Sequence, residues 1–375
     1  MNAQDSQFMA RALRLAERGN YTTSPNPRVG CVLVKGGEPS AAAKIIAEAW
    51  HQKAGQGHAE ILALQMAGEK AKGATCYVSL EPCNHTGRTG PCTEALIEAG
   101  IARVVYAMED PNPQVGGAGV ARLREAGIEV DGPLMNQEAA RINMGYVKRM
   151  ATGRPFIRVK MAMSLDGRTA MPDGNAFWIT GPRARTDVQR LRARSCAILT
   201  GWRSAAMDKS QMTVRADEFE IAEEGLGERQ PLRVLVDSKL QMEKDARFFQ
   251  AQTPVLVANL SRDGSGAEES ESHISYLKIE EAEGHVDLTE LVEKLGDRGI
   301  NELLVETGSE LSGAFLRAGL VDELIIYMAP KLMGSDARAL FELPLQKMTE
   351  SLPLHIKEVR QLGGDLRITA SPEME

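Results

Sequence analysis

The pattern of apolar and polar positions in the first 150 residues alternates between the helical and the strand period. Apolar side chains recur at helical spacing from Phe8 to Ala16 and predict a helix over residues 5–19. Short apolar runs bounded by turn-forming residues predict strands at 29–34, 75–80 and 102–108 and a strand that ends at Trp50. The segments between them predict helices that begin near His58, end at Gly100 and cover 120–127. Strands that alternate with helices predict an α/β sheet with helices on both faces.

The alternation starts again near residue 150, after the segment KRMATGRP at 148–155, which we interpret as a linker. Strands are predicted at 156–164, 196–200, 232–237, 254–258, 302–306 and 323–328, and helices at 182–194, 287–298 and 309–318. The polar stretches 216–230 and 261–272 are predicted to be solvent-exposed loops. Because 375 residues exceed the usual size of one domain, we predict two α/β domains, 1–150 and 151–375.

Composition narrows the class of protein. Hydrophobic residues make up 43% and charged residues 25% of the chain, as in ordinary globular proteins. The first 19 residues lack the apolar core and the cleavage site of a signal peptide, and no apolar run has membrane length. We therefore expect a cytoplasmic protein without membrane contact, whose five cysteines are thiols or metal ligands. A net charge of −7 argues against nucleic acid as a partner, whereas an anionic small substrate would need a local pocket of cations or N–H groups.

The strongest chemical signal is the order His58-Ala59-Glu60, Pro82-Cys83 and Cys92. One imidazole and two thiolates are a ligand set for catalytic zinc (Zn²⁺), whose fourth position holds water. Zinc lowers the pKa of this water from about 16 towards about 7, so that hydroxide forms at neutral pH. Glu60 lies on the same helical turn as His58 and is placed to carry the proton of the water to a ring nitrogen and to departing ammonia, as in zinc nucleobase deaminases. These residues predict hydrolytic deamination of an amino-pyrimidine.

A structural zinc site is the alternative interpretation of the same residues. It would need a fourth protein ligand, for which His85 is the candidate, and it would leave Glu60 without a role. The eight residues between the two cysteines also include Arg88, and His85 and Arg88 are suited to hold an anionic or ribosyl substituent beside the metal. The other cysteines lie in apolar, strand-like runs and are predicted to be buried thiols: Cys31, Cys76 and Cys196.

Longer motifs extend this picture over nearly the whole chain. They are SPNPRVGCV, HQKAGQGHAEI, LEPCNHTGRTGPC and EDPNPQV in the first half, and RPFIRVKMAMSLDGRTAM, LRVLVDS, VETGSELSGAFL and VDELIIYMAPKLMG in the second. Together they resemble the bifunctional pyrimidine deaminase/reductase family of riboflavin biosynthesis. The resemblance implies a cytidine-deaminase-like N-terminal domain followed by a dihydrofolate-reductase-like C-terminal domain. It further implies deamination of 2,5-diamino-6-(5-phosphoribosylamino)pyrimidin-4(3H)-one, and then NADPH-dependent reduction of the ribosyl side chain to ribityl.

The resemblance also assigns residues to each step. In the deaminase half it implies that His58, Cys83 and Cys92 hold zinc, that Glu60 is the catalytic proton shuttle, and that substrate contacts come from Asn26, His51, His85 and Arg88. In the reductase half the implied NADPH contacts are Lys160, Ala162, Trp178, Ser204, Asp208, Ser238 and the run Gly308, Ser309, Glu310, Leu311, Ser312, Gly313 and Ala314. The implied substrate contacts there are Ala176, Arg192, Met212, Arg215 and Glu306, and the arginines suit the ribose phosphate. Apart from the resemblance, Gly308 follows a predicted strand and opens a predicted helix, where free N–H groups face an anion.

The sequence departs from the family pattern in the reductase half. Ala176 stands where the family has serine, and the segment 201–210 carries Trp202 and Arg203 where the family has smaller residues. These departures leave two alternatives to the bifunctional enzyme. One is a deaminase with an impaired reductase domain, and the other is a non-catalytic, zinc-stabilised module that binds nucleotides. Exposed sheet edges and the resemblance favour a homo-oligomer.

Overall fold

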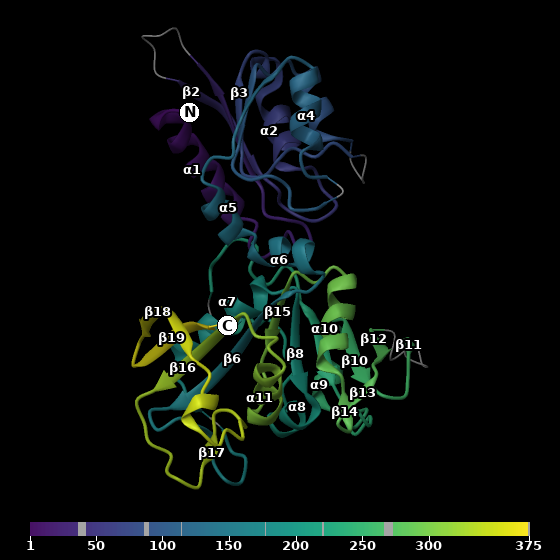
Figure 1. Ribbon diagram of the computed structural model, residues 1–375, viewed down its shortest axis with the longest axis vertical. Helices are drawn as coiled ribbons and strands as arrows, with labels where there is room; N and C mark the ends of the chain where they lie inside the picture. Colours follow the sequence, from purple (N-terminus) through teal and green to yellow (C-terminus); the bar gives the residue numbers. More distant parts are fainter. Residues whose placement is uncertain are drawn as a thin grey trace. The chain divides into compact units, whose positions relative to one another are not determined.

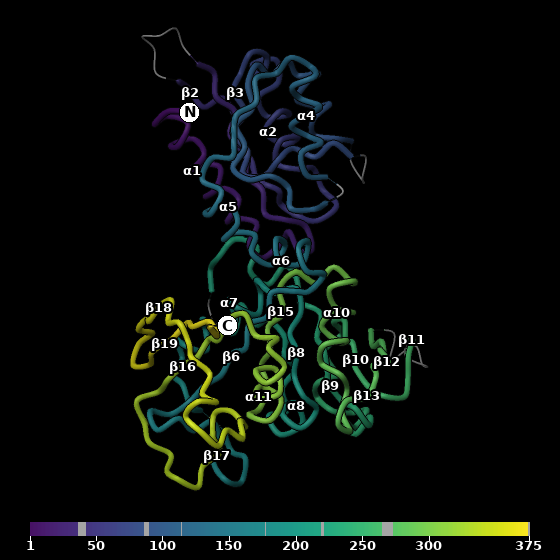
Figure 2. The backbone as a smooth tube through the Cα atoms, viewed as in Figure 1, coloured from purple at the N-terminus to yellow at the C-terminus, as the bar shows by residue number. Residues whose placement is uncertain are grey.

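The computed structural model describes residues 1–36, 43–85, 90–113, 115–176, 178–219, 221–265 and 273–373. The chain folds into two units, Met1–Gly153 and Arg154–Glu375, and each is built around its own β-sheet (Figure 1). The backbone trace of the first unit runs from purple to blue, and that of the second from teal to yellow (Figure 2).

The first unit contains a five-stranded sheet in the order β2-β1-β3-β4-β5. Its strands are β1 (Gly30–Lys35), β2 (Lys44–Trp50), β3 (Thr75–Val78), β4 (Arg103–Tyr106) and β5 (Glu129–Asp131). β1 pairs antiparallel with β2 and β3, whereas β3, β4 and β5 are parallel. Every residue of β1 from Gly30 to Val34 is buried. Because successive side chains of a strand point to opposite faces, both faces of this sheet are covered.

Helices supply this cover. They are α1 (Ala3–Glu17), α2 (Ala59–Ala67), α3 (Cys92–Glu98), α4 (Ala118–Glu125), α5 (Asn136–Ile142) and α6 (Met144–Thr152), with a short 3-10 turn, η1 (Gly68–Ala71). α1 packs against β1 and β3 and is in turn contacted by α5, whereas α2 packs against β1, β2 and α3. The prediction of a sheet between two layers of helices is confirmed for this unit (Figure 1).

The end of the first unit differs from the prediction. β5, α5 and α6 were not predicted, and the linker interpretation of 148–155 is wrong in its first half because α6 continues to Thr152. Gly153 ends the helix with a φ of 74°, in the left-handed region that glycine adopts readily. Basic side chains such as Lys148 and Arg149 are equally typical of a linker and of the last turn of a helix, where they interact favourably with the helix dipole.

The second unit contains a ten-stranded sheet in the order β11-β12-β10-β9-β8-β15-β6-β16-β19-β18. The strands are β6 (Phe156–Ser164), β8 (Ala197–Gly201), β9 (Leu232–Val236), β10 (Val255–Asn259), β11 (Gly264–Ser265), β12 (Ile274–Lys278), β15 (Glu302–Val305), β16 (Glu323–Ala329), β18 (Leu354–Leu362) and β19 (Asp365–Pro372). The strands from β12 to β16 in this order are parallel neighbours, and β11, β19 and β18 are antiparallel to theirs. Short strand pairs are formed by β7 (Arg168–Ala170) with β17 (Arg338–Ala339) and by β13 (Glu281–Ala282) with β14 (His285–Val286).

The helices of the second unit are α7 (Pro182–Arg194), α8 (Trp202–Met207), α9 (Arg247–Gln250), α10 (Leu288–Asp297) and α11 (Ser309–Arg317), with 3-10 turns at Asp217–Phe219 and Met348–Glu350. The strands and helices predicted for this half are confirmed, but α8, α9, β12, β18, β19 and the short strands β7, β11, β13, β14 and β17 were missed. β18 shows why: a bulge between Ile356 and Glu358 interrupts its alternation, and nearly all of its side chains are exposed. A strand of this kind carries no clear period-2 signal.

A buried ion-pair network joins the three central strands of the second unit. The Arg158 guanidinium on β6 donates from one terminal nitrogen to Glu302 of β15, at 2.5 Å, and from Nε to Glu323 of β16, at 2.9 Å. The Arg158 side chain is 2% exposed, so the network fixes the relative positions of these strands. Lys160, two residues further along β6, is thereby placed on the same face of the sheet as Arg158.

A second network joins α1 to the sheet of the first unit. Asp5 accepts hydrogen bonds from Arg103 of β4 and from the Tyr77 hydroxyl of β3, both at 2.8 Å, and caps its own helix through the Asn2 N–H. Burial would raise the pKa of Asp5, but these three donors outweigh it and lower the pKa to about 2. The ionised carboxylate is therefore the form that the folded protein stabilises.

Neutralising Asp5 is expected to destabilise the first unit in a pH-dependent manner. Because the pKa of Asp5 is depressed on folding, its charge contributes about 2 kcal/mol above pH 4, and this contribution falls to about half near pH 3 as the carboxylate takes up its proton. Denaturant unfolding of Asp5→Asn and the wild type at pH 7 and pH 3 measures the difference. An equal loss at both pH values would contradict an electrostatic origin.

Within the described ranges, no helix is both long and apolar enough to cross a membrane. None of the five cysteines forms a disulfide, and all five are buried. Cys31 on β1 and Cys76 on β3 face each other with sulfur atoms 3.5 Å apart, and Cys196 precedes β8. The prediction that these three are core thiols is confirmed.

Candidate functional site

Three soft ligand atoms converge between the strands and helices of the first unit. His58 Nδ1 lies 3.2 Å from the Cys92 sulfur and 3.5 Å from the Cys83 sulfur. The potential ligand atoms all lie within 4.8 Å of one another. In the part of the chain that the structure describes, no other group of three or more His, Cys, Asp or Glu residues is arranged to hold a metal ion. His85 does not belong to the group, so the fourth ligand required by a structural zinc site is not found here.

The starts of two helices position the three ligands. His58 is the N-cap residue of α2, and Cys92 is the first residue of α3. The backbone N–H of Cys92 points at the Cys83 sulfur, at 3.5 Å. Hydrogen bonds from Cys92 and His58 outweigh burial and lower the pKa of the Cys83 thiol to about 4. A helix N-terminus favours thiolate, which is the form that binds zinc, so the donor set fits this metal.

Glu60 is the second residue of α2, in its first turn, and is 3% exposed. Burial raises the pKa of its carboxyl group to about 7, against the opposing effect of His58. Its Oε2 atom is buried, and among the described residues it has no hydrogen-bond partner. A buried carboxylate oxygen normally has a donor, and a water on the metal would be the donor that this atom lacks. The orphaned oxygen is thus a second, independent sign that the site fits a metal.

Two further predicted residues adjoin the ligands. The His51 Nδ1–H donates to the Gly57 carbonyl at 3.0 Å, which leaves Nε2 as the acceptor for the Asn26 amide at 3.1 Å. The rings of His51 and His58 meet edge to face, with centroids 5.5 Å apart. Burial lowers the pKa of His51 and keeps its ring neutral. His85 is exposed on the loop that follows Cys83, and Arg88 lies outside the described residues.

The second unit contains a pocket of about 1660 Å³. It lies at the carboxyl ends of β8, β9 and β15, where parallel α/β sheets commonly bind ligands. All but two of the residues predicted for this half line it, namely Lys160, Ala162, Ala176, Trp178, Arg192, Ser204, Asp208, Met212, Arg215, Ser238, Glu306, Gly308, Ser309, Glu310, Leu311 and Ala314. Ser312 and Gly313 do not line it, because both are buried on the side of α11 that packs against the rest of the unit. The Ser312 hydroxyl contacts the Met161 sulfur at 3.2 Å, and a Cβ on Gly313 would lie 2.4 Å from the Glu342 carbonyl oxygen.

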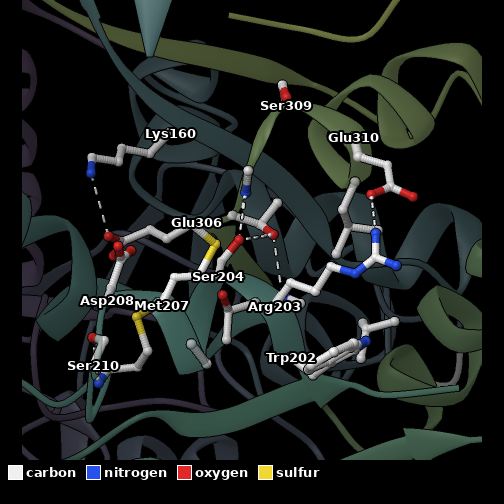
Figure 3. A pocket seen from close by; sticks show the side chains of 18 of the residues that line it. Lys160, Trp202, Arg203, Ser204, Met207, Asp208, Ser210, Glu306, Ser309 and Glu310 are labelled. Atoms are coloured by element: carbon white, nitrogen blue, oxygen red, sulfur yellow. Dashed lines mark hydrogen bonds and ion pairs between the residues drawn. The ribbon is translucent and has the colours of Figure 1, made fainter. Parts of the chain in front are cut away.

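Charged groups alternate in sign across the floor of this pocket. The Glu306 carboxylate accepts two hydrogen bonds from Arg192, at 2.7 and 3.1 Å. It also lies 3.5 Å from the Lys160 ammonium (Figure 3). Burial would raise the pKa of Glu306, but Arg192 and Lys160 lower it to about 2. Burial raises the pKa of the nearby Asp208 carboxyl. The floor therefore combines an ionised carboxylate, a lysine ammonium and a second, more easily protonated carboxyl group.

The turn before α11 lines the pocket and is hydrogen-bonded to α8. Ser204 on α8 accepts a hydrogen bond from the Gly308 N–H at 3.0 Å, and Arg203 pairs with Glu310 at 3.2 Å (Figure 3). Gly308 is the N-cap of α11, as the sequence predicted. Trp202 and Arg203, which depart from the family pattern, both line the pocket. Trp178 is 60% exposed, so the pocket rim rather than the core holds this aromatic ring.

Two family models match the chain. The cytidine and deoxycytidylate deaminase zinc-binding region matches residues 2–108, and the RibD C-terminal domain matches residues 155–368. The riboflavin biosynthesis protein RibD of Escherichia coli K12 is 50% identical over 97% of this chain and 98% of its own length. That of Haemophilus influenzae is 49% identical over 99% of this chain and 98% of its own length. This chain belongs to the RibD family.

Solved RibD structures share the fold of the whole chain. Acinetobacter baumannii RibD, form 1, is similar with a TM-score of 0.89 at 42% identity, over 99% of both chains. A diaminohydroxyphosphoribosylaminopyrimidine deaminase/5-amino-6-(5-phosphoribosylamino)uracil reductase from Thermotoga maritima gives a TM-score of 0.83 at 32% identity, over 98% of both chains. The predicted family and its two fold classes are confirmed.

Like other RibD proteins, this chain is a bifunctional enzyme of riboflavin biosynthesis, with a zinc-binding deaminase domain and a reductase domain that uses NADPH. The match of both halves supports this interpretation over a deaminase alone or a non-catalytic module.

Sequence reasoning missed the role of one buried residue of this chain beside the zinc ligands. Glu81, two residues before Cys83, is 2% exposed, and its carboxylate accepts four backbone N–H groups at 3.0 to 3.2 Å. The donors lie in the loop before α4 and in its first turn: Asp110, Gly117, Gly119 and Val120. Glu81 thus ties the loop that carries Cys83 to the EDPNP loop. An acidic residue next to Pro-Cys was the only signal in the sequence.

Replacing Glu81 by Gln is expected to lower the rate of ammonia release by about tenfold, because an amide nitrogen would face N–H donors and the loop that carries Cys83 would shift. Steady-state deaminase kinetics and the zinc content of Glu81→Gln measure the effect. Glu94→Gln, which removes a carboxylate paired with Arg122 at the surface of α3, is the matched control. Equal rates for the two variants would contradict a positioning role for Glu81.

Proposed function

We propose that the first domain, 1–150, hydrolyses the 2-amino group of 2,5-diamino-6-(5-phosphoribosylamino)pyrimidin-4(3H)-one. The second domain, 151–375, then reduces the ribosyl side chain of the product to ribityl with NADPH. The observation that carries the proposal is the orphaned Oε2 atom of Glu60 beside three soft ligands. It is supported by the pocket of the second unit, which gathers nearly all of the residues expected there.

In the deaminase domain, His58, Cys83 and Cys92 hold zinc, which when bound supplies a Lewis acid that makes water a nucleophile at neutral pH. Glu60 is the catalytic acid and base. Burial raises the pKa of its carboxyl group. We assign two successive proton transfers to Oε2: it takes one proton from the attacking water and gives it to the ring nitrogen, and it then takes the remaining hydroxyl proton and gives it to the amino group, which leaves as ammonia. Burial shields Glu60 from bulk solvent.

Substrate orientation in this domain is assigned to the residues around the ligands. The neutral His51 ring and the Asn26 amide form a fixed donor and acceptor pair for the pyrimidine. His85 and Arg88, on the loop between the cysteines, take the ribosyl phosphate side of the substrate.

In the reductase domain, NADPH supplies a hydride when bound. We assign contacts with NADPH to Lys160, Ala162, Trp178, Ser204, Asp208 and Ser238, and contacts with its phosphates to the segment 308–314 at the start of α11; the six residues named first all line the pocket. Within that segment, Gly308, Ser309, Glu310, Leu311 and Ala314 line the pocket, whereas Ser312 and Gly313 contribute packing.

We assign proton delivery to the opening ribose ring to Lys160 and Asp208, because the Lys160 ammonium lies 3.5 Å from Glu306 and the charges of both groups act on the Asp208 carboxyl. The remaining substrate contacts are Ala176, Arg192, Met212, Arg215 and Glu306, all of which line the pocket.

We further propose a cytoplasmic homo-oligomer that binds small molecules and not nucleic acid. The negative net charge opposes binding to a polyanion, and the buried cysteines, none of which forms a disulfide, suit a reducing compartment. Support for self-association comes from the edge strand β18. Its bulge brings Val359 onto the same face as Leu354 and Ile356, and the three apolar side chains are 40–57% exposed.

Replacing Glu60 by Gln tests the deaminase assignment. The variant is expected to lose 10²- to 10⁴-fold in ammonia release, because the amide cannot carry the proton. It should keep its zinc and still oxidise NADPH when supplied with the already deaminated substrate. Ammonia release, zinc content and NADPH oxidation are measured on the full chain.

The outcomes separate the alternatives. The wild type should consume one NADPH for each ammonia released. Ammonia without NADPH oxidation would indicate a deaminase with an impaired reductase, and full activity of Glu60→Gln would indicate a structural zinc and reject the proposed mechanism.

A charge on the exposed face of β18 tests the oligomer. Ile356→Asp is expected to lower the mass in solution to that of a single chain, because an apolar contact would have to bury a carboxylate. Sedimentation equilibrium provides the measurement. His355→Asp adds the same charge to the opposite face of the strand and should leave the mass unchanged. A monomeric wild type would refute the proposal.

A further inference from the structure

Among the arginines that line the reductase pocket, Arg192 and Arg247 both act electrostatically on Arg215, and of these three only Arg192 and Arg215 were expected. Arg192 lies on α7, Arg215 follows Met212, and Arg247 is the first residue of α9. All three line the same pocket. Arg247 lies outside every motif that the sequence analysis singled out.

The first two arginines already have partners. Arg192 is held in two-point contact by Glu306, which offsets its charge, and it also donates to the Thr213 carbonyl at 3.1 Å. Arg215 pairs with Glu218 at 2.9 Å. Both guanidinium groups therefore enter the pocket with a carboxylate close by.

Arg247 differs from them in this respect. Its side chain is exposed to the pocket, and no described residue forms an ion pair or hydrogen bond with its guanidinium group. It lies close enough to Arg215 for their charges to repel. The pKa of Arg215 is lowered by burial, by Arg192 and, to a smaller extent, by Arg247. Cations held this near to one another have a high affinity for a divalent anion between them.

The position of Arg247 is built into the fold by a buried cation. Arg233 on β9 is 1% exposed, and its guanidinium donates to the carbonyl of Gln211, at 3.1 Å, and to that of Phe248. It also donates to the carbonyls of Ala251 and Thr253, each at 2.7 Å. Arg233 therefore joins the segment that carries Met212 and Arg215 to α9.

Apolar packing reinforces this connection. Phe248, which follows Arg247, is buried in one cluster with Met212 and with Ala205 of α8. These contacts fix the backbone of α9 relative to the segment 211–215, so Arg215 and Arg247 project into the pocket from two connected segments. The contacts of Arg233 and Phe248 are a second, independent reason to regard the surroundings of Arg215 and Arg247 as a preformed site.

We propose that Arg247 binds a phosphomonoester dianion together with Arg215, and that this dianion is the 5-phosphate of the ribosylamino substrate. The inference rests on the proposed function of the second domain. The reaction has one other phosphomonoester, the 2′-phosphate of NADPH. The substrate is favoured because Arg247 is connected to the segment of Met212 and Arg215, whereas the expected cofactor turn is bonded to Ser204 and Glu342.

The test compares Arg247→Ala, Arg247→Lys and the wild type as full chains with two substrates. These are 5-amino-6-(5-phosphoribosylamino)uracil and its dephosphorylated counterpart. Arg247→Ala is expected to raise KM for the phosphorylated compound roughly 10- to 100-fold, the effect of losing a charge-assisted contact, with little change for the dephosphorylated one. Arg247→Lys should recover part of the loss. Arg298→Ala, which removes an exposed arginine of the same unit outside the pocket, should match the wild type.

Each other result overturns the proposal. An equal loss with both substrates would assign Arg247 a purely structural role. A rise in KM for NADPH but not for NADH would assign it to the cofactor. Ammonia release by the other domain of the same chain reports that each variant is intact.

A wild type that fails to oxidise NADPH would refute the proposed function and not the anion site. In that case equilibrium binding of ribose 5-phosphate, compared with ribose, decides the site. Arg247→Ala must weaken ribose 5-phosphate binding by the same factor, and unchanged binding would refute the site itself.

Discussion

A charged group that leaves water must find a partner, and this constraint governs both units. Arg158 is surrounded by two glutamates, Arg233 by four backbone carbonyls and Glu81 by four backbone N–H groups. These contacts hold strands and loops together. Glu60 differs from the other acids, because among the described residues its Oε2 is the one buried carboxylate oxygen without a hydrogen-bond partner. The proposed chemistry of the first unit takes place at this unpaired oxygen atom.

In the second unit, charged groups on the floor of the pocket also have partners of opposite charge. Its parallel strands bring residues distant in sequence to one edge of the sheet, so that Lys160 of β6 meets Glu306 after β15 and Arg192 of α7. The one carboxylate offsets one of the two positive charges, and cations outnumber carboxylates among the other residues that line the pocket. This arrangement gives one part of the pocket a balanced set of proton donors and acceptors, and another part an excess of positive charge for an anionic substrate.

Much of this was predictable because the decisive residues are close in sequence and each lies at the end of an element. His58 and Cys92 lie at helix starts, and Gly308 follows a buried strand, so local patterns place them. Short apolar runs also predicted the inner strands, which are buried on both faces. This signal failed for β18, where a bulge interrupts the period and solvent reaches nearly every side chain. Motif matching included Ser312 along with its neighbours, although helical geometry turns it away from the pocket.

The sequence by itself determined the ligand types, the order of the two domains and the family, because these depend on residue identity and on short spacings. Only the tertiary structure decided which charges meet. Glu81 connects two loops because its four N–H donors come from residues 29 to 39 positions away. Arg247 lines the pocket because the buried Arg233 on β9 binds a backbone carbonyl of its helix, α9. Such pairings are set by how elements pack, and no local pattern along the chain encodes them.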